Sequence, residues 1–221
     1  MCIRAVIFDC DGTLLDSERI YMGTWKTLGK KLGYQIPEQL LLETRGKSDE
    51  VGKRLFLEVM GEDFPYQMFK DIRRDMNEVA VSTTPREKLI KPGVERLFQW
   101  LKEHEMKIAV ASAKSYQMTS DHLKYAELYE MADVVLGKDM VEHIKPAPDV
   151  FLKAAEILGV SSEECVVVGD TLSDVRAAEA AGMKMFFVPD LVAVDEEIEE
   201  KSFEILNQID ELIEILDKGK M

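Results

Sequence analysis

The chain has 221 residues, of which 28 are Lys or Arg and 42 are Asp or Glu, so its formal net charge at pH 7 is −14. Hydrophobic residues make up 46% and charged residues 32% of the chain, which is ordinary for a folded protein and excludes a largely disordered one. The negative charge also excludes a broad nucleic-acid-binding surface, because it repels a phosphate backbone. Any phosphate that this protein handles must be attracted by a few positive groups placed locally.

Short apolar runs rich in Val, Ile or Phe mark the expected strands. They do not alternate with polar residues, which is typical of parallel strands that are buried on both faces. These runs lie at residues 5–8, 108–111, 165–168 and 185–188, with a weaker fifth at 134–136.

Helical patterns lie between the later runs. Apolar residues recur at helical spacing over residues 94–101, 150–158 and 175–181. This alternation of strand and helix predicts an α/β fold with a Rossmann-like parallel sheet core.

One long segment breaks the alternation. Between about residues 17 and 88 the chain has no buried-strand pattern, and apolar residues at helical spacing fill the segment instead. About seventy residues exceed what a crossover between two strands requires. We therefore predict an inserted helical subdomain at residues 16–85, within a core made of residues 1–15 and 86–221.

The C-terminal end holds most of the negative charge. From residue 190 onward eleven acids face only three bases, and apolar residues recur among them. The spacing of these apolar residues predicts a closing helix whose solvated face carries the acids. The apolar positions are Ile205, Ile209, Leu212, Ile213 and Leu216.

Cysteine usage and hydropathy bear on the compartment. The three cysteines, Cys2, Cys10 and Cys165, are odd in number and have no metal-ligand spacing. No apolar run approaches the ~18 residues that cross a membrane, and the start of the chain does not resemble a signal peptide. We expect a cytoplasmic protein, a monomer by default, with no membrane partner.

Carboxylates follow two of the predicted strands. Asp9 and Asp11 end the first run, and Asp170 and Asp174 follow the run at 165–168. Ligands of open parallel sheets bind beyond the carboxyl ends of the strands, so these side chains would converge if the two strands are neighbours. Clustered carboxylates need a cation, and oxygen ligands without Cys or His favour Mg²⁺. The alternative is that they only cap a turn and a helix.

Two further polar residues stand at comparable places. Ser112 follows the run at 108–111, and Lys145 lies in the segment after the weaker strand. A hydroxyl and a compact ammonium there can hold phosphate oxygens beside a metal ion. Taken alone, Ser112 would be a helix N-cap and Lys145 a solvated surface residue. Their order in the chain relative to the carboxylates favours a functional role for both.

Four motifs follow one another along the chain: Asp-Cys-Asp-Gly-Thr at 9–13, Ser112 after a buried strand, Lys145 in Lys-Pro-Ala-Pro-Asp, and Gly-Asp-Thr-Leu-Ser-Asp at 169–174. Together and in this order they resemble the motifs of the haloacid dehalogenase-like phosphotransferases. The likeness extends from residue 3 to about residue 190, and the inserted segment resembles the helical cap of the phosphoglycolate phosphatase and β-phosphoglucomutase branch.

The resemblance implies an acid–base and nucleophile pair. Asp9 would attack phosphorus and form an aspartyl-phosphate. Asp11 would protonate the leaving oxygen and then deprotonate the incoming water. The dehalogenases of the family lack an acid at the position of Asp11, because halide needs no proton, so Asp11 favours phosphate chemistry.

The resemblance also implies a Mg²⁺ site and a phosphate site. Asp174 would support the metal or orient a phosphate-binding lysine. The metal ligands would be Asp9, Asp170 and the backbone carbonyl of Asp11, and the phosphate-binding residues would be Ser112, Ala113 and Lys145.

Three departures from the mutase pattern favour hydrolysis. Where enzymes of the β-phosphoglucomutase type carry a histidine, an arginine and a glutamate, this chain has Tyr21, Asp49 and Gly169. A mutase must hold a second phosphate on its cap, and Asp49 would repel it.

Arg45, Gly46 and Lys47 are the candidate specificity residues of the cap. Gly46 permits close approach of the backbone to a substrate. Arg45 or Lys47 would pair with an anionic or polyol substrate. The alternative is that both cations are ordinary solvated charges.

The sequence therefore predicts a Mg²⁺-dependent phosphatase, a phosphoric monoester hydrolase. Its expected partner is a small phosphorylated metabolite, such as a sugar phosphate or a phosphoglycolate-like acid, and neither nucleic acid nor a membrane. The alternatives are a phosphosugar mutase of the β-phosphoglucomutase type and a non-catalytic protein that binds a phosphometabolite.

Overall fold

The computed structural model, which describes residues 3–219, contains one sheet of six parallel strands. The strand order is β3-β2-β1-β4-β5-β6, so the first strand lies in the middle, between the second and the fourth. The carboxyl ends of β1, β2 and β4 therefore meet at one edge. The strands are β1 (Ala5–Phe8), β2 (Lys107–Ala111), β3 (Val134–Leu136), β4 (Cys165–Gly169), β5 (Lys184–Phe187) and β6 (Glu204–Ile205).

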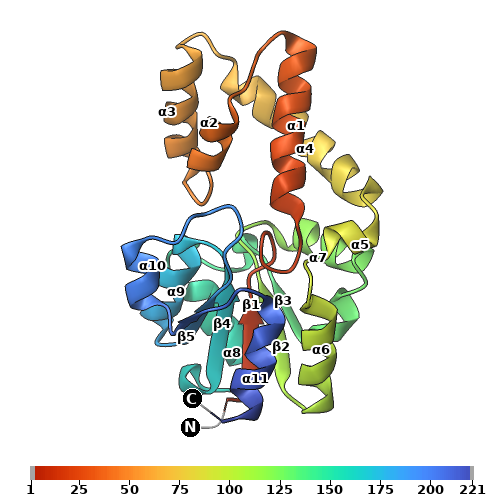
Figure 1. The fold of residues 1–221 in the computed structure, drawn as a ribbon, viewed down its shortest axis with the longest axis vertical. Helices are drawn as coiled ribbons and strands as arrows, with labels where there is room; N and C mark the ends of the chain where they lie inside the picture. The colour runs from red at the N-terminus through yellow and green to blue at the C-terminus, as the bar shows by residue number, and fades with distance from the viewer. Residues whose placement is uncertain (1–2, 220–221) are drawn as a thin grey trace.

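Helices cover both faces of the sheet (Figure 1). Val6 and Phe8 of β1 pack in one apolar cluster, with helices on one face, and Ala5 and Ile7 pack in a second cluster on the other. This is why the strand has no polar alternation, since both of its faces are buried. The core helices are α5 (Arg86–Leu89), α6 (Val94–Glu103), α7 (Tyr116–Tyr125), α8 (Asp149–Leu158), α9 (Leu172–Ala181), α10 (Glu196–Lys201) and α11 (Leu212–Asp217).

Four helices between β1 and α5 form a separate layer above the sheet (Figure 1). They bury their own apolar cluster, in which the Trp25 ring stacks on Phe56 at 4.3 Å and on Phe69 at 5.6 Å between centroids. The prediction of an α/β fold with an inserted helical cap is therefore confirmed. The cap helices are α1 (Ser17–Leu32), α2 (Glu38–Glu43), α3 (Asp49–Met60) and α4 (Tyr66–Thr83).

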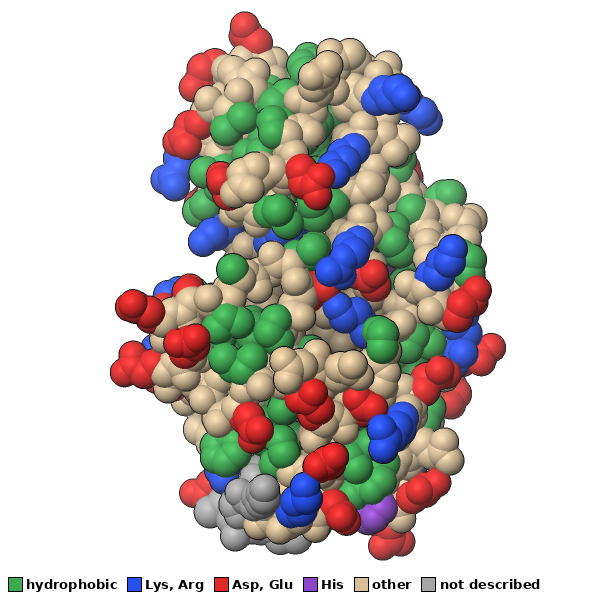
Figure 2. Space-filling model, in the orientation of Figure 1, with side chains coloured by type: hydrophobic (Ala, Val, Ile, Leu, Met, Phe, Trp, Pro, Cys, Tyr) green, Lys and Arg blue, Asp and Glu red, His purple; other side chains and the backbone are tan. Residues whose placement is uncertain are grey.

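The surface is hollowed between the cap and the core. Figure 2 shows this notch on the left of the molecule, with Lys and Arg side chains on its upper rim. No helix within residues 3–219 is both long and apolar enough to cross a membrane.

The prediction of one closing helix from residue 205 is wrong. Ile205 belongs to β6, which pairs with β5, and the helix α11 begins only at Leu212. The edge of β5 has backbone groups that need partners, and the segment at 203–206 provides them: Phe203 N–H donates to Met185 O, and Leu206 N–H donates to Phe187 O.

One of the acids expected on a solvated face is also buried. The side chain of Asp190 has no exposed surface, and its Oδ1 lies 2.5 Å from Arg19 Nη1 of the cap and 2.5 Å from Lys91 Nζ of the core. Asp190 therefore ties the start of the cap to the core, because a buried carboxylate requires cationic partners.

Candidate active site

The turn after β1 brings two strand ends together. Gly12 has a φ of +89°, and a Cβ at this position would lie 2.3 Å from Asp170 Oδ2. The backbone of the turn therefore passes so close to Asp170 that only glycine fits. The next residue fixes the same carboxylate, since Thr13 Oγ1 donates to Asp170 Oδ1 at 2.8 Å.

Three carboxylates converge at the carboxyl ends of β1 and β4. Asp9, Asp170 and Asp174 are 6%, 2% and 1% exposed, and one oxygen of each lies within 4.8 Å of the others. Within residues 3–219, Asp11 contributes no carboxylate oxygen to this group. β1 and β4 are neighbours, which is the condition that the sequence left open, and their ends bring these carboxylates together.

Lys145 is the buried cation of this cluster. Its Nζ lies 2.6 Å from Asp9 Oδ1, 2.8 Å from Asp174 Oδ1 and 2.7 Å from the carbonyl oxygen of Ala111. Burial alone would lower the pKa of Lys145. The negative charges of Asp174 and Asp9 outweigh this effect of burial and raise the pKa. Lys145 is therefore not the solvated surface residue of the alternative interpretation.

The carboxylates are hard to ionise in the absence of a further cation. Burial, with the nearby Asp174, raises the pKa of Asp9 to about 7 against the pull of Lys145. Burial, with the charges of Asp9 and Asp174, raises the pKa of Asp170 well above its ordinary value. Three buried carboxylates share one ammonium, so their full ionisation would leave an excess of negative charge at the site.

This donor set fits a divalent cation. A positive ion at the group would offset the excess charge, and an oxygen-only ligand set is what Mg²⁺ prefers. Asp9 and Asp170, which directly follow β1 and β4, lie close enough together to share such an ion.

Asp11 occupies a different environment from Asp9. Its Oδ1 accepts hydrogen bonds from Ser17 Oγ and, at 3.3 Å, from Tyr21 Oη, and it lies 2.6 Å from Lys114 Nζ. Lys114 Nζ also lies 3.7 Å from the centroid of the Tyr21 ring. Burial opposes the ionisation of Asp11, but the Lys114 charge and these hydrogen bonds outweigh it and lower the pKa. The pKa values of these two neighbouring carboxyls are thus shifted in opposite directions.

The loop after β2 supplies the remaining polar residues of the core. Ser112 is buried, and its Oγ accepts a hydrogen bond from Lys114 N–H at 3.0 Å. Ala113 is exposed between them. The side-chain cap of helix α7 is Ser115, not Ser112. Ser112 therefore stands at the strand end without the N-cap function of the alternative interpretation.

The cap loop with Arg45, Gly46 and Lys47 faces the core. The carbonyl oxygen of Gly46 accepts a 3.4 Å hydrogen bond from Ser173 Oγ, and a Cβ on Gly46 would lie 3.7 Å from Thr171 Cβ. The loop thus rests on the segment that follows Asp170. Beside it the cap contains a cavity of about 350 Å³, lined by Glu18, Trp25, Thr44, Arg45, Gly46, Lys47, Ser48, Asp49, Gly52, Phe56 and Tyr66.

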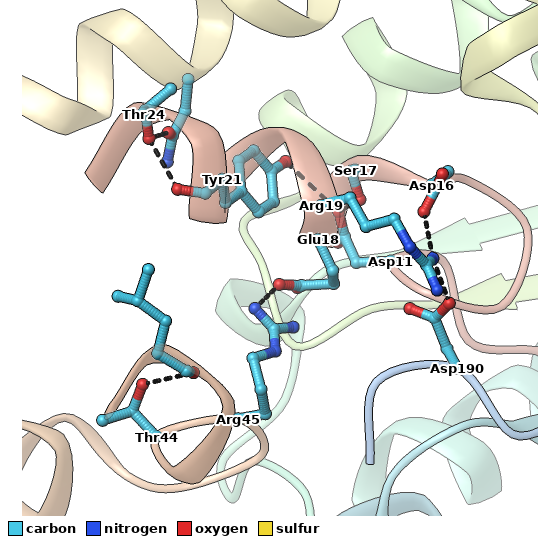
Figure 3. A network of polar contacts seen from close by, with 12 residues as sticks. Asp11, Asp16, Ser17, Glu18, Arg19, Tyr21, Thr24, Thr44, Arg45 and Asp190 are labelled. Carbon is cyan, nitrogen blue, oxygen red and sulfur yellow. Dashed lines mark hydrogen bonds and ion pairs between the residues drawn. The ribbon is translucent and has the colours of Figure 1, made fainter. Parts of the chain in front are cut away.

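Arg45 is not a free solvated charge. Figure 3 shows its guanidinium turned toward Glu18 at the start of α1, with which it forms an ion pair. Burial lowers the pKa of Arg45, against the opposing charges of Asp170, Asp11 and Asp190. Lys47 is exposed on the rim of the cavity.

Sequence reasoning missed three groups around Asp11 and Arg45. Lys114 stands two residues after Ser112, so the strand-end argument that found Ser112 could have included it. Ser17 and Glu18 had no such signal, because their partners at Asp11 and Arg45 are brought to them only by the packing of the cap on the core.

The chain matches the model of one protein family. Residues 6–188 match the haloacid dehalogenase-like hydrolases. The chain belongs to this family.

Two curated relatives illustrate the membership, and one solved structure shares the fold. The phosphoglycolate phosphatase of Aquifex aeolicus is 32% identical, over 82% of this chain and 83% of the relative. The phosphorylated carbohydrates phosphatase of Thermotoga maritima is 28% identical, over 84% of each chain. The β-phosphoglucomutase of Clostridium difficile has the same fold, with a TM-score of 0.77, 20% identity and 99% coverage of both chains. The chain is thus an enzyme of a hydrolase family whose named relatives include phosphatases.

Proposed function

We propose that this enzyme is a Mg²⁺-dependent phosphatase that hydrolyses a small phosphomonoester through an aspartyl-phosphate on Asp9. The observation that carries the proposal is the pair of carboxylates in opposite environments. Asp9 lies on the buried Lys145 inside the acidic cluster, while Asp11, two residues on, has its own partners in Lys114 and Ser17. Separated environments of this kind allow one carboxylate to attack while the other exchanges protons.

Each step uses a group already in place. An oxygen of Asp9 attacks phosphorus, the bond from phosphorus to the ester oxygen breaks, and Asp11 gives its proton to that oxygen. Asp11 then takes a proton from water as the water attacks phosphorus, and the phosphorus–Asp9 bond breaks. Phosphate oxygens that draw Lys114 away from Asp11 would raise the pKa of Asp11 and so supply the protonated acid that the first step needs.

The acidic cluster would hold the metal ion. Asp9, Asp170 and the backbone carbonyl of Asp11 would bind Mg²⁺, with Asp174 close by and in contact with Lys145. When bound, the ion neutralises charge between the phosphoryl oxygens and the carboxylates. Lys145, Ser112 and the backbone at Ala113 would hold the phosphoryl oxygens.

The cap would enclose the rest of the substrate. We propose residues 16–85 as the cap and residues 1–15 with 86–221 as the catalytic core. The cap cavity of about 350 Å³ lies at the lower end of the roughly 300–1,000 Å³ that small-molecule sites occupy. Relatives named for phosphoglycolate and for phosphorylated carbohydrates support a substrate of this size.

A mutase is disfavoured by two features of the site. A Cβ on Gly169 would lie 2.7 Å from Asp174 Cβ, so the glutamate found there in the mutases would displace Asp174. Asp49 places a carboxylate on the cavity wall where a mutase needs a cation for its second phosphate. The retained nucleophile, acid, lysine and metal carboxylates disfavour a non-catalytic binding protein.

A phosphate-release screen tests the proposal. We expect Mg²⁺-dependent release of phosphate from members of a panel of phosphorylated metabolites, and loss of release with EDTA. A coupled assay with β-glucose 1-phosphate and its bisphosphate activator should give no glucose 6-phosphate above background. Release that does not depend on a divalent cation, or turnover in the mutase assay alone, would contradict the proposal.

A further inference from the structure

The ionisable groups that line the cap cavity balance one another. Two are acids and two are bases: Glu18, Asp49, Arg45 and Lys47. Glu18 is paired with Arg45 (Figure 3). Asp49 has partners of its own, since Lys70 Nζ lies 2.6 Å from its Oδ2 and Tyr66 Oη donates to its Oδ1 at 3.3 Å. The cavity lining therefore offers a substrate both carboxylates and donors, and its most buried acid and base, Glu18 and Arg45, compensate each other.

The Glu18–Arg45 pair stands on the side of the cavity nearest the carboxylates Asp9, Asp11, Asp170 and Asp174 of the core, a site called the core crevice below. Glu18 directly follows Ser17, which donates to Asp11, and Arg45 directly precedes Gly46, which rests on the segment after Asp170. Only 12% of the Glu18 side chain and 17% of the Arg45 side chain are exposed. A substrate whose phosphate lies at Asp9 and whose other end lies in the cap cavity would therefore place its carbon skeleton beside this pair.

Such a pair has different consequences for a hydroxyl and for an anion. A hydroxyl can donate to a Glu18 oxygen or accept from the exposed part of the Arg45 guanidinium without breaking the pair. A carboxylate or a second phosphate would have to take Arg45 from Glu18 and would then lie beside the released Glu18 charge. In a partly buried site that repulsion is only weakly screened by solvent.

We propose that the Glu18–Arg45 ion pair makes this enzyme select phosphomonoesters whose carbon skeleton is uncharged and hydroxylated, and reject those with a second anionic group near the ester. This inference rests on the proposed phosphatase function and narrows its substrate class to polyol and sugar monophosphates. Lys47 does not reverse the preference, because its exposed charge on the rim is screened by water.

The test uses two substrates that differ at one carbon. Glycerol 3-phosphate ends in a hydroxymethyl group where 3-phosphoglycerate has a carboxylate, and both have an alkyl leaving group. We expect the wild-type kcat/KM to favour glycerol 3-phosphate by about tenfold or more. A wild-type preference for 3-phosphoglycerate would overturn the inference.

Two variants should move this ratio in opposite directions. Glu18→Gln leaves the Arg45 charge uncompensated, so it should shift the ratio about tenfold toward 3-phosphoglycerate. Arg45→Gln leaves the Glu18 charge uncompensated, so it should shift the ratio further toward glycerol 3-phosphate. Lys53→Gln, the matched control, removes an exposed cap cation outside the cavity lining and should change the ratio by less than about threefold. Variants that both shift the ratio in one direction, or that leave it unchanged, would show that the pair is only structural.

Two measurements keep this inference separate from the proposed function. Turnover of para-nitrophenyl phosphate, which has no second polar end, reports on the core chemistry alone, so its absence would contradict the phosphatase itself. Dissociation constants of the two three-carbon phosphates, measured calorimetrically on Asp9→Asn with Mg²⁺ present, give the selectivity without turnover. The same preference for glycerol 3-phosphate is expected there, and equal constants would overturn the inference.

Discussion

The core crevice and the cap cavity both gather acids and bases, but they balance them differently. In the crevice, Asp9, Asp170 and Asp174 share the single buried ammonium of Lys145. In the cavity, acids and bases are matched in number, and the deepest two are paired with each other. An excess of negative charge requires a cation, whereas a balanced wall suits an uncharged ligand. Under the proposed function, this difference would leave the chemistry to the core and the choice of substrate to the cap.

Replacement of the nucleophile should have the largest effect. Asp9→Asn keeps the shape of the side chain but removes the attacking oxygen charge, so kcat for phosphate release should fall by about four orders of magnitude or more. Phosphate release under saturating substrate and Mg²⁺ measures it. Asp75→Asn changes an acid whose side chain is 89% exposed on the cap and should leave kcat unchanged. Equal activity of the two variants would remove the distinction between crevice and surface.

The effect of replacing Asp11, the proposed acid, should depend on the leaving group of the substrate. Asp11→Asn should lower kcat/KM for an alkyl phosphate by about 10²–10⁴-fold, because an alkoxide leaves only with a proton. For para-nitrophenyl phosphate, whose leaving group is stable without a proton, phosphorylation of the enzyme should slow much less. Burst kinetics separate this step from the hydrolysis that follows. A burst that slows equally for both esters would contradict the assignment of Asp11 as the acid.

Metal binding should depend on pH through the crevice carboxylates. The folded pKa of Asp9 is about 7 and the ordinary value is 3.8, so ionising this residue destabilises the metal-free fold as pH rises through that window. Mg²⁺ requires the ionised form, so it should bind more tightly at pH 8 than at pH 5.5.

Thermal unfolding with and without Mg²⁺ checks this expectation. At 100 times its Kd the ion stabilises the fold by about 2.7 kcal/mol, which raises Tm by roughly 5–10 °C in a protein of this size. That shift should be present at pH 8, much smaller at pH 5.5, and absent in Asp170→Asn. An equal shift at both pH values would mean that the ion binds elsewhere.

A change on the cap rim should have the smallest effect. Lys47→Gln removes an exposed charge that lines the cavity, so KM should change by less than about threefold and kcat should stay the same. Steady-state kinetics on the best substrate of the screen measure both constants. A large fall in kcat would mean that the cap takes part in the chemistry as well as in selection.

The sequence was most informative where the signal is local. Asp9 and Asp170 could be placed because each ends an apolar strand, and parallel topology makes neighbouring strand ends meet. The pairing of Lys114 with Asp11 and of Arg45 with Glu18 could not be predicted, since it depends on how loops far apart in the chain pack together. The C-terminal prediction failed because Ile205 fits a helical stripe equally well, and only the open edge of β5 decides for a strand.

Trapping the covalent intermediate tests the central claim most directly. Asp11→Asn should still form the aspartyl-phosphate from a substrate with a good leaving group, such as para-nitrophenyl phosphate with Mg²⁺, but should hydrolyse it slowly because no base activates the water. After acid quench, peptide mapping by mass spectrometry should find one phosphate per chain, on Asp9. No phosphorylated peptide, or a phosphate on any other residue, would contradict the account.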